Sequence, residues 1–170
     1  MDYFLLSQDQ RIPHPVEPSG ALKAHFENHP DVNAVIQLNI KTAEYTEYID
    51  FIAKPWPLVS DRLKQLLQRF EKKATFLPVV LADKVHGEQH LYWGLIPPKL
   101  DCLSEDTQFN KDGTIKKLVL DPKPAAACRL FQIDRVMENY LVANLIVVES
   151  MLRRNFTGFK LTRIELESKT

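Results

Sequence analysis

Two pairs of histidines have the spacing that could place two metal ligands together. His25 and His29 are four residues apart, and so are His86 and His90. On an α-helix this spacing turns both imidazoles toward one face, where they could share a zinc ion. The helical zinc-protease motif also requires a glutamate directly after the first histidine, which both pairs lack, and His86 precedes Gly87 in a predicted turn. We therefore expect surface histidines, no metal site and no cofactor.

Two cysteines and some neighbouring carboxylates are the other groups that could do chemistry. Cys128 lies in an apolar stretch, and Cys102 follows Asp101, whose negative charge disfavours a thiolate. A nucleophilic cysteine needs a base beside it, and neither local pattern supplies one. Adjacent acids such as Glu105 and Asp106 are typical of solvated loops. Since phosphate-binding glycine loops and the Gly-x-Ser-x-Gly elbow are also missing from the sequence, we expect no catalytic residues and no enzyme.

The composition favours a cytoplasmic protein with one core. A chain of 170 residues that is 45% hydrophobic can close a single sizeable core. Its 22 basic side chains equal its 22 acidic ones, so no bulk field attracts nucleic acid or an anionic membrane. The first ten residues lack the basic start of a signal peptide, and no apolar run is long enough to span a bilayer.

Behind this neutral total, the charge is unevenly distributed. Residues 1–60 hold eight acids and four bases, which leaves fourteen acids and eighteen bases for the rest of the chain. One explanation is two solvated faces whose opposite charges attract each other. The other is an acidic surface that docks a basic partner.

Apolar, aromatic and β-branched runs predict more strands than helices. We expect strands over residues 34–40, 45–53, 76–81, 90–96, 114–120, 127–133 and 159–166. The first two should form an antiparallel pair through a turn at 41–44, and the next two should also pair. Prolines in residues 11–20 indicate a surface arm, and those at 122 and 124 are expected to stop a strand.

One helix is clearly indicated, and a second is shorter. Leu63, Leu66, Leu67 and Phe70 recur at helical spacing after Ser60, which is placed to cap the helix. Residues 141–154 are predicted to be a strand followed by a short helix. Trp56 is expected to pack over the amino end of the first helix.

These elements predict an α+β fold with a mostly antiparallel sheet and a few helices in one compact domain over residues 1–170. Strands outnumber helices and do not alternate with them regularly, which argues against a doubly wound sheet. Whether residues 1–55 form an N-terminal subdomain stays open.

Several short blocks, in one order, resemble a family of proteins. They are Trp56-Pro57-Leu58-Val59-Ser60, Phe76-Leu77-Pro78-Val79, Leu100-Asp101-Cys102-Leu103-Ser104, Gly113, Leu118-Val119-Leu120-Asp121, Arg129-Leu130-Phe131, Leu145-Ile146-Val147-Val148 and Thr157-Gly158-Phe159. Together, over residues 56–166, they are similar to a bacterial polymorphic-toxin immunity-protein family first catalogued as a domain of unknown function.

The resemblance implies an immunity protein that neutralises a cognate toxin effector domain by direct contact, as in bacterial competition. It transfers no catalytic residues, and it implies that the toxin-binding surface lies in the polar segments between the blocks or in the acidic first third. In that third, Tyr45, Glu47, Tyr48 and Asp50 are our predicted partner-binding residues, on one edge of the expected strand. The alternatives are a small metal-dependent hydrolase that uses the histidines and a regulatory subunit of another intracellular complex.

Overall fold

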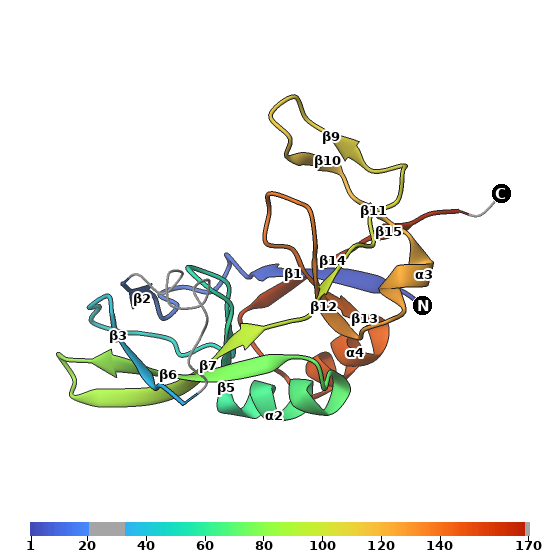
Figure 1. The fold of residues 1–170 in the computed structure, drawn as a ribbon. Coiled ribbons are helices and arrows are strands. Elements are labelled where there is room, and N and C mark those ends of the chain that lie inside the picture. The colour runs from blue at the N-terminus through green and yellow to red at the C-terminus, as the bar shows by residue number, and fades with distance from the viewer. Residues whose placement is uncertain (21–32, 169–170) are drawn as a thin grey trace.

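Two mixed sheets make up the framework in the computed structural model, which describes residues 1–20 and 33–168 (Figure 1). The six-stranded sheet has the order β2 (Pro18–Ser19), β3 (Ile36–Ile40), β6 (Thr75–Asp83), β7 (Glu88–Ile96), β5 (Leu58–Ser60) and β4 (Phe51–Ile52). The five-stranded sheet has the order β14 (Phe159–Arg163), β1 (Tyr3–Gln8), β13 (Leu141–Asn144), β12 (Leu130–Ile133) and β8 (Lys99–Leu100).

Two small strand pairs and three short helices complete the described part of the chain. The strand pairs are β9 (Gln108–Phe109) with β10 (Ile115–Lys117), and β11 (Val119–Leu120) with β15 (Glu165–Leu166). The helices are α2 (Asp61–Phe70), α3 (Pro122–Ala125) and α4 (Leu145–Arg153). Most strand neighbours are antiparallel, so the predicted α+β class with a mostly antiparallel arrangement in a single compact domain is confirmed. No described helix has the length and apolar character that crossing a bilayer requires.

Elements with strong local signals form as predicted. In α2 the apolar residues face the core, and the Ser60 hydroxyl accepts a hydrogen bond from the Leu63 backbone N–H at 3.2 Å. Strands β6 and β7 pair in register from Thr75 opposite Ile96 to Asp83 opposite Glu88. The predicted strand followed by a helix over residues 141–154 corresponds to β13 and α4, with the Asn144 side chain as the helix cap.

The predicted antiparallel hairpin of residues 34–40 with 45–53 is wrong. Strand β3 lies between β2 and β6 and runs parallel to β6, while only Phe51–Ile52 of the second segment is a strand, paired with β5. The segment before it bonds elsewhere, because the Glu47 N–H donates to the His14 carbonyl and the Val16 N–H donates to the Glu47 carbonyl. Glu47 therefore pairs with the proline-rich segment 11–20, and residues 45–50 do not form the predicted strand beside β3.

The prolines after Asp121 follow the end of a strand as expected, since β11 ends at Leu120, whereas the expectation for Trp56 is corrected. Pro122 then begins α3, capped by the Asp121 carboxylate, because proline is well accommodated in a first helical turn. Trp93, and not Trp56, lies at the start of α2, where its indole N–H donates to Asp61 at 2.9 Å. The indole of Trp56 donates to the Leu95 carbonyl at 2.9 Å and packs in the core of the six-stranded sheet.

The first 55 residues contribute strands to both sheets. Strand β1 lies between β13 and β14, which come from the other end of the chain, and β4 pairs with β5. Figure 1 shows the amino-terminal strand β1 within the five-stranded sheet, where it is the second strand, beside β14. The main apolar cluster lies where α2 and α4 cover the sheets, and includes the buried Leu63, Val147 and Met151. Burying each such side chain stabilises the fold by about 1.5–3 kcal/mol.

The two sheets meet at a backbone crossing made by Thr157 and Gly158. The Thr157 carbonyl accepts hydrogen bonds from the N–H groups of Asp50 and Phe51, each at 3.1 Å, and the Gly158 carbonyl accepts one from Asp9 at 2.9 Å. Gly158 has a φ of +97°, and a Cβ there would lie 2.4 Å from the Phe51 carbonyl oxygen. Only glycine therefore permits this close approach.

Replacing Gly158 with alanine should lower the free energy of unfolding by about 2–4 kcal/mol. The left-handed backbone contributes about 1 kcal/mol of this and the clash about 1–3 kcal/mol. Gly87→Ala is the matched control, because Gly87 also has a positive φ, of +67°, but has open space around its Cβ position. Its expected loss is about 1 kcal/mol. Urea denaturation of both variants checks this, and equal losses would contradict the crossing as a constraint.

Candidate functional site

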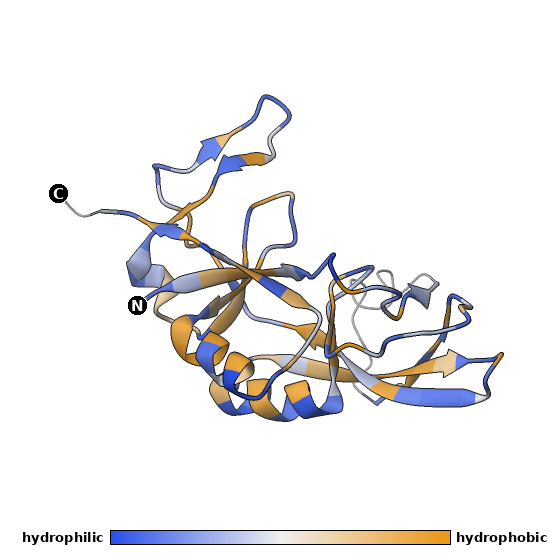
Figure 2. Cartoon of the chain, turned by 180° about the vertical axis from the view of Figure 1, so that it is seen from behind, coloured by the Kyte–Doolittle hydropathy of each residue, from blue (hydrophilic) through white to orange (hydrophobic). Residues whose placement is uncertain are grey.

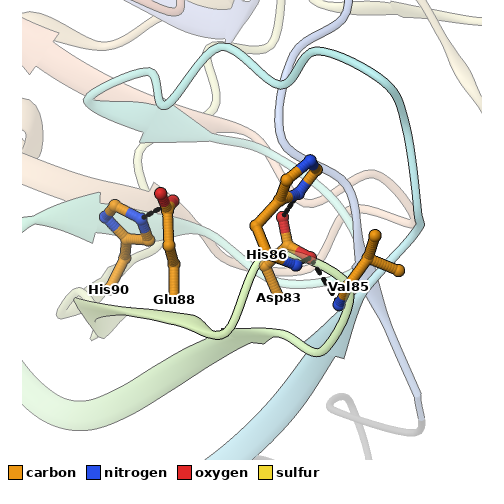
Figure 3. Close-up of polar contacts among 5 residues, drawn as sticks. All are labelled: Asp83, Val85, His86, Glu88 and His90. Carbon is orange, nitrogen blue, oxygen red and sulfur yellow. Dashed lines mark hydrogen bonds and ion pairs between the residues drawn. The ribbon is translucent and has the colours of Figure 1, made fainter.

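The tip of the β6–β7 hairpin holds the one tight acid–histidine pair in the described part of the chain (Figure 3). Asp83 is buried at the end of β6, and its Oδ1 accepts the backbone N–H groups of Val85 at 3.0 Å and His86 at 3.1 Å. The other oxygen, Oδ2, lies 2.6 Å from His86 Nδ1. The carboxylate thus closes the turn and orients the imidazole, whose Nε2 is left for other contacts.

This contact shifts the pKa of both groups. The hydrogen bond to Asp83 is the main cause that raises the pKa of His86, and the same bond to His86 lowers the pKa of Asp83. The Glu88 charge raises the pKa of His86 further, to a smaller extent. The contact therefore stabilises the imidazolium form of His86 and the carboxylate form of Asp83.

The second histidine of this hairpin belongs to a separate arrangement. His90 Nε2 lies 3.2 Å from a Glu88 oxygen, and the imidazole stacks on the Tyr48 ring with 3.6 Å between ring centres. Burial raises the pKa of the Tyr48 hydroxyl, as do the charges of Asp83 and Glu88. Among the described residues that hydroxyl is buried with no hydrogen-bond partner.

The histidines at the hairpin tip do not converge on one metal position. His86 and His90 each face their own carboxylate (Figure 3). Within residues 1–20 and 33–168, no three His, Cys, Asp or Glu side chains are grouped so that they could hold a metal ion. His25 and His29 lie outside the described residues.

The four predicted partner-binding residues have different surroundings and do not share a strand edge. Tyr45 is 63% exposed, and Tyr48 is stacked on His90. The backbone of Glu47 forms hydrogen bonds with His14 and Val16 of the proline-rich segment 11–20. The Asp50 carboxylate accepts hydrogen bonds from the Ser60 hydroxyl at 2.6 Å and from the Thr157 N–H at 2.9 Å. Tyr45 and Tyr48 thus lie near the surface, whereas Asp50 has internal partners at the junction of the sheets.

Both cysteines are buried. Burial, assisted by the charges of Asp101 and Asp121, raises the pKa of the Cys102 thiol to about 12. Burial is also the main cause that raises the pKa of Cys128, and the Glu71 charge adds to it. Both sulfurs are held as thiols in the core.

Several acids of the first third are already paired inside the molecule. The ion pairs are Asp2 with Arg163, Asp9 with Arg11, and Glu17 with Lys41. The first pair joins the acidic third to the basic remainder, as the explanation by two attracting faces expects. These contacts leave less acidic surface for a basic partner than the sequence count alone suggests.

A projecting arm is the feature that sequence reasoning did not single out. We define it as residues 105–117, which contain the β9–β10 hairpin, together with residues 134–139 of the loop between β12 and β13. Figures 1 and 2 show the hairpin standing away from the body of the molecule, on the side away from α2 and α4. Glu138 joins the two parts by accepting the Ile115 N–H at 2.7 Å, and Met137 lies against Gly113.

The arm exposes two large apolar side chains. Phe109 is 49% exposed and Met137 is 71% exposed, beside the exposed Lys111 and Lys116, for which the described residues supply no carboxylate partner. Phe and Met are enriched at protein-binding surfaces, whose rims are polar. A phenylalanine in an otherwise polar stretch, 105–112, was the available sequence signal.

The comparisons with known proteins add no relative to this description: no protein-family model matches the chain, and no curated protein matches it.

The His86 titration should depend on Asp83. Because the folded pKa of His86 is raised, the stability from its charged form is complete below about pH 6.5 and is lost as pH rises through the folded pKa. The lowered pKa of Asp83 makes its contribution present above about pH 3.9 and lost as pH falls through the folded value. In an NMR titration, Asp83→Asn should move the His86 midpoint down toward about 6.5.

Asn retains the turn-closing side-chain oxygen at position 83, so this variant changes the charge and keeps the geometry. The control is Glu88→Gln, which should move the His86 midpoint less, since Glu88 is the smaller cause. An unchanged midpoint in Asp83→Asn would contradict the pairing.

Asp50→Ala should lower the free energy of unfolding by about 2–3 kcal/mol, because it leaves the Thr157 N–H and the Ser60 hydroxyl without their acceptor. Glu47→Ala, which removes a side chain that makes no hydrogen bond or ion pair with the described residues, should change it by less than about 0.5 kcal/mol. Chemical denaturation of both variants measures the difference. Equal effects would show that Asp50 does not join the sheets.

Proposed function

We propose that this protein binds a toxin effector domain through the projecting arm and neutralises it by direct contact, as an immunity protein does. The observation that carries the proposal is the exposure of Phe109 and Met137 on two loops that hold each other in place. Such a protein would act in the cytoplasm of the cell that makes the toxin.

The chemistry of the arm suits an interface centre. Aromatic and methionine side chains are enriched at protein interfaces, and the few residues that dominate binding usually lie in a central apolar patch with polar surroundings. Phe109 and Met137 would be the apolar centre, and Lys111 and Lys116 would supply the charged surroundings. The flexible thioether of Met137 can adapt to the shape of a partner.

Local hydrogen bonds reduce the ordering that binding would require. Thr114 N–H and its hydroxyl both donate to Asp112 at the hairpin turn, at 3.0 and 2.6 Å. The Thr107 hydroxyl fixes the base of the arm by donating to the Val119 carbonyl at 2.8 Å. A preorganised loop loses less conformational entropy on association, which favours affinity.

The choice of a toxin as the partner rests on the sequence resemblance. Apart from Gly113, the arm lies in polar segments between the resembling blocks, before Leu118-Val119-Leu120-Asp121 and after Arg129-Leu130-Phe131. Partner-specific binding within one fold requires scaffold segments that are separated by polar surface segments able to differ between family members.

Co-expression with the toxin domain encoded by the adjacent gene tests the proposal, scored by cell survival and by purification of a complex. Phe109→Ala with Met137→Ala should weaken the complex about 30-fold or more, because truncating central apolar residues typically removes at least about 2 kcal/mol of binding. Calorimetry with the purified toxin domain measures the affinity.

The control variant is Leu152→Ala. Leu152 is 53% exposed on α4, which lies on the opposite side of the molecule from the arm (Figure 1). It should leave the affinity within about twofold. Cell death, or survival without a complex, would overturn the toxin as the partner. Equal weakening by the arm variant and the control would overturn the arm as the surface.

A further inference from the structure

A basic groove lies where α2 meets the segment that follows α4. It encloses about 360 Å³ and is lined by Arg62, Gln65, Leu66, Arg69, Arg154 and Phe156. Three of these six residues are arginines, and the depression opens to solvent on the helical side of the molecule, away from the arm.

Neutral groups hold two of these guanidinium groups in place. Arg62 Nη2 donates to the Arg154 carbonyl oxygen at 3.1 Å, and the Arg62 guanidinium lies over the Phe156 ring at 4.6 Å from its centre. Arg154 Nη1 donates to the Ser150 carbonyl at 3.0 Å. Carbonyls and an aromatic face orient these cations without cancelling their charge.

The positive charge of the groove is therefore largely uncompensated. In the described part of the chain, none of Arg62, Arg69 and Arg154 forms an ion pair, whereas the adjacent Arg153 is paired with Glu149 at 3.3 Å. The carboxylate nearest in sequence, Asp61, already accepts hydrogen bonds from Trp93 and Gln65. Even with Asp61 counted, the groove has two more positive charges than negative ones.

The spacing of the arginines favours several separate anionic groups over one compact ion. Arg62 and Arg69 are seven residues apart, which corresponds to about 10 Å along a helix. A single phosphate is best bound by donors that converge, such as the backbone N–H groups at a helix start. Here the Leu63 N–H at the start of α2 is occupied by Ser60. Leu66 and Phe156 add apolar contact area between the charges.

We infer that the groove binds an acidic segment of a partner protein, whose carboxylates pair with Arg62, Arg69 and Arg154. Arginine suits this task because its planar group bonds carboxylates in a bidentate manner. The site does not depend on the arm, since α2, which supplies four of the lining residues, lies on the side of the molecule away from the β9–β10 hairpin (Figure 1). It also fits the positive surplus of residues 61–170.

A synthetic peptide with glutamates separated by serines is the probe, titrated into the full chain at low salt and again at high salt. NMR shifts of the arginine side-chain N–H groups and of the Gln65 and Leu66 backbone report the location. We expect shifts confined to the groove and an affinity that falls as salt rises. Arg69→Gln and Arg154→Gln should each weaken peptide binding about threefold to fivefold.

Arg153→Gln is the matched control, because it removes a neighbouring arginine that Glu149 already neutralises. It should leave peptide affinity within about twofold. Arg69 is the decisive position, since no hydrogen bond or ion pair of its side chain is recorded among the described residues, so its variant should fold normally. Circular dichroism of each variant verifies the fold.

Three outcomes would overturn the inference. One is that the peptide shifts map outside the groove. Another is that Arg153→Gln weakens binding as much as Arg69→Gln, which would show a general attraction to the basic surface. The third is that inorganic phosphate binds the groove as tightly as the peptide, which would show a site for a single small anion. Because no toxin is present in these titrations, their result is independent of the proposed immunity function.

Discussion

The close backbone crossing at Thr157 and Gly158 is the constraint on which the arrangement of the two sheets depends. The Thr157 carbonyl accepts hydrogen bonds from the N–H groups of Asp50 and Phe51, and the Asp50 carboxylate accepts one from the Thr157 N–H. The same carboxylate accepts a hydrogen bond from the hydroxyl of Ser60, whose side chain also caps α2. A helix start, a sheet edge and the turn before β14 are thereby fixed relative to one another through a single acidic side chain. This junction helps to fix the positions of both candidate surfaces. Helix α2 lines the groove, and β14 belongs to the sheet that supports the arm.

Elements that depend on the residue pattern of one short segment could be predicted from the sequence. The apolar spacing of α2, its Ser60 cap and the pairing of β6 with β7 are local, so residue pattern alone determines them. The partners of β1 and β3 could not be predicted in this way. Strand β1 pairs with strands from the far end of the chain, and β3 runs parallel to β6 across an intervening helix. Such pairings depend on burial summed over the whole fold, and the residues of an apolar strand do not indicate which distant strand it pairs with.

The candidate sites show a similar division. An exposed Tyr45 and a solvated histidine hairpin could be expected from residue type, but the role of Asp50 depends on Thr157, 107 residues later in the chain. The arm was missed because a polar stretch with one phenylalanine is typical of an ordinary loop, and the sequence shows neither the exposure of Phe109 and Met137 nor the hydrogen bond that joins their two loops. The sequence did contain a signal for α3, because aspartate followed by proline is a common helix start, as in Asp121-Pro122.

Net charge along a sequence is an unreliable guide to electrostatic surfaces, because it counts charges without their partners. Counting suggested an acidic first third, yet Asp2, Asp9 and Glu17 each have a basic side chain beside them. Two of the three groove arginines, Arg62 and Arg154, contact carbonyl oxygens, and Arg62 also lies over an aromatic ring; these neutral partners orient the guanidinium groups without neutralising their charge. A formally neutral protein can therefore present a positive surface of defined shape. The sign of a docking surface follows from which charges the fold pairs internally, and here that reasoning points to an acidic ligand for the groove.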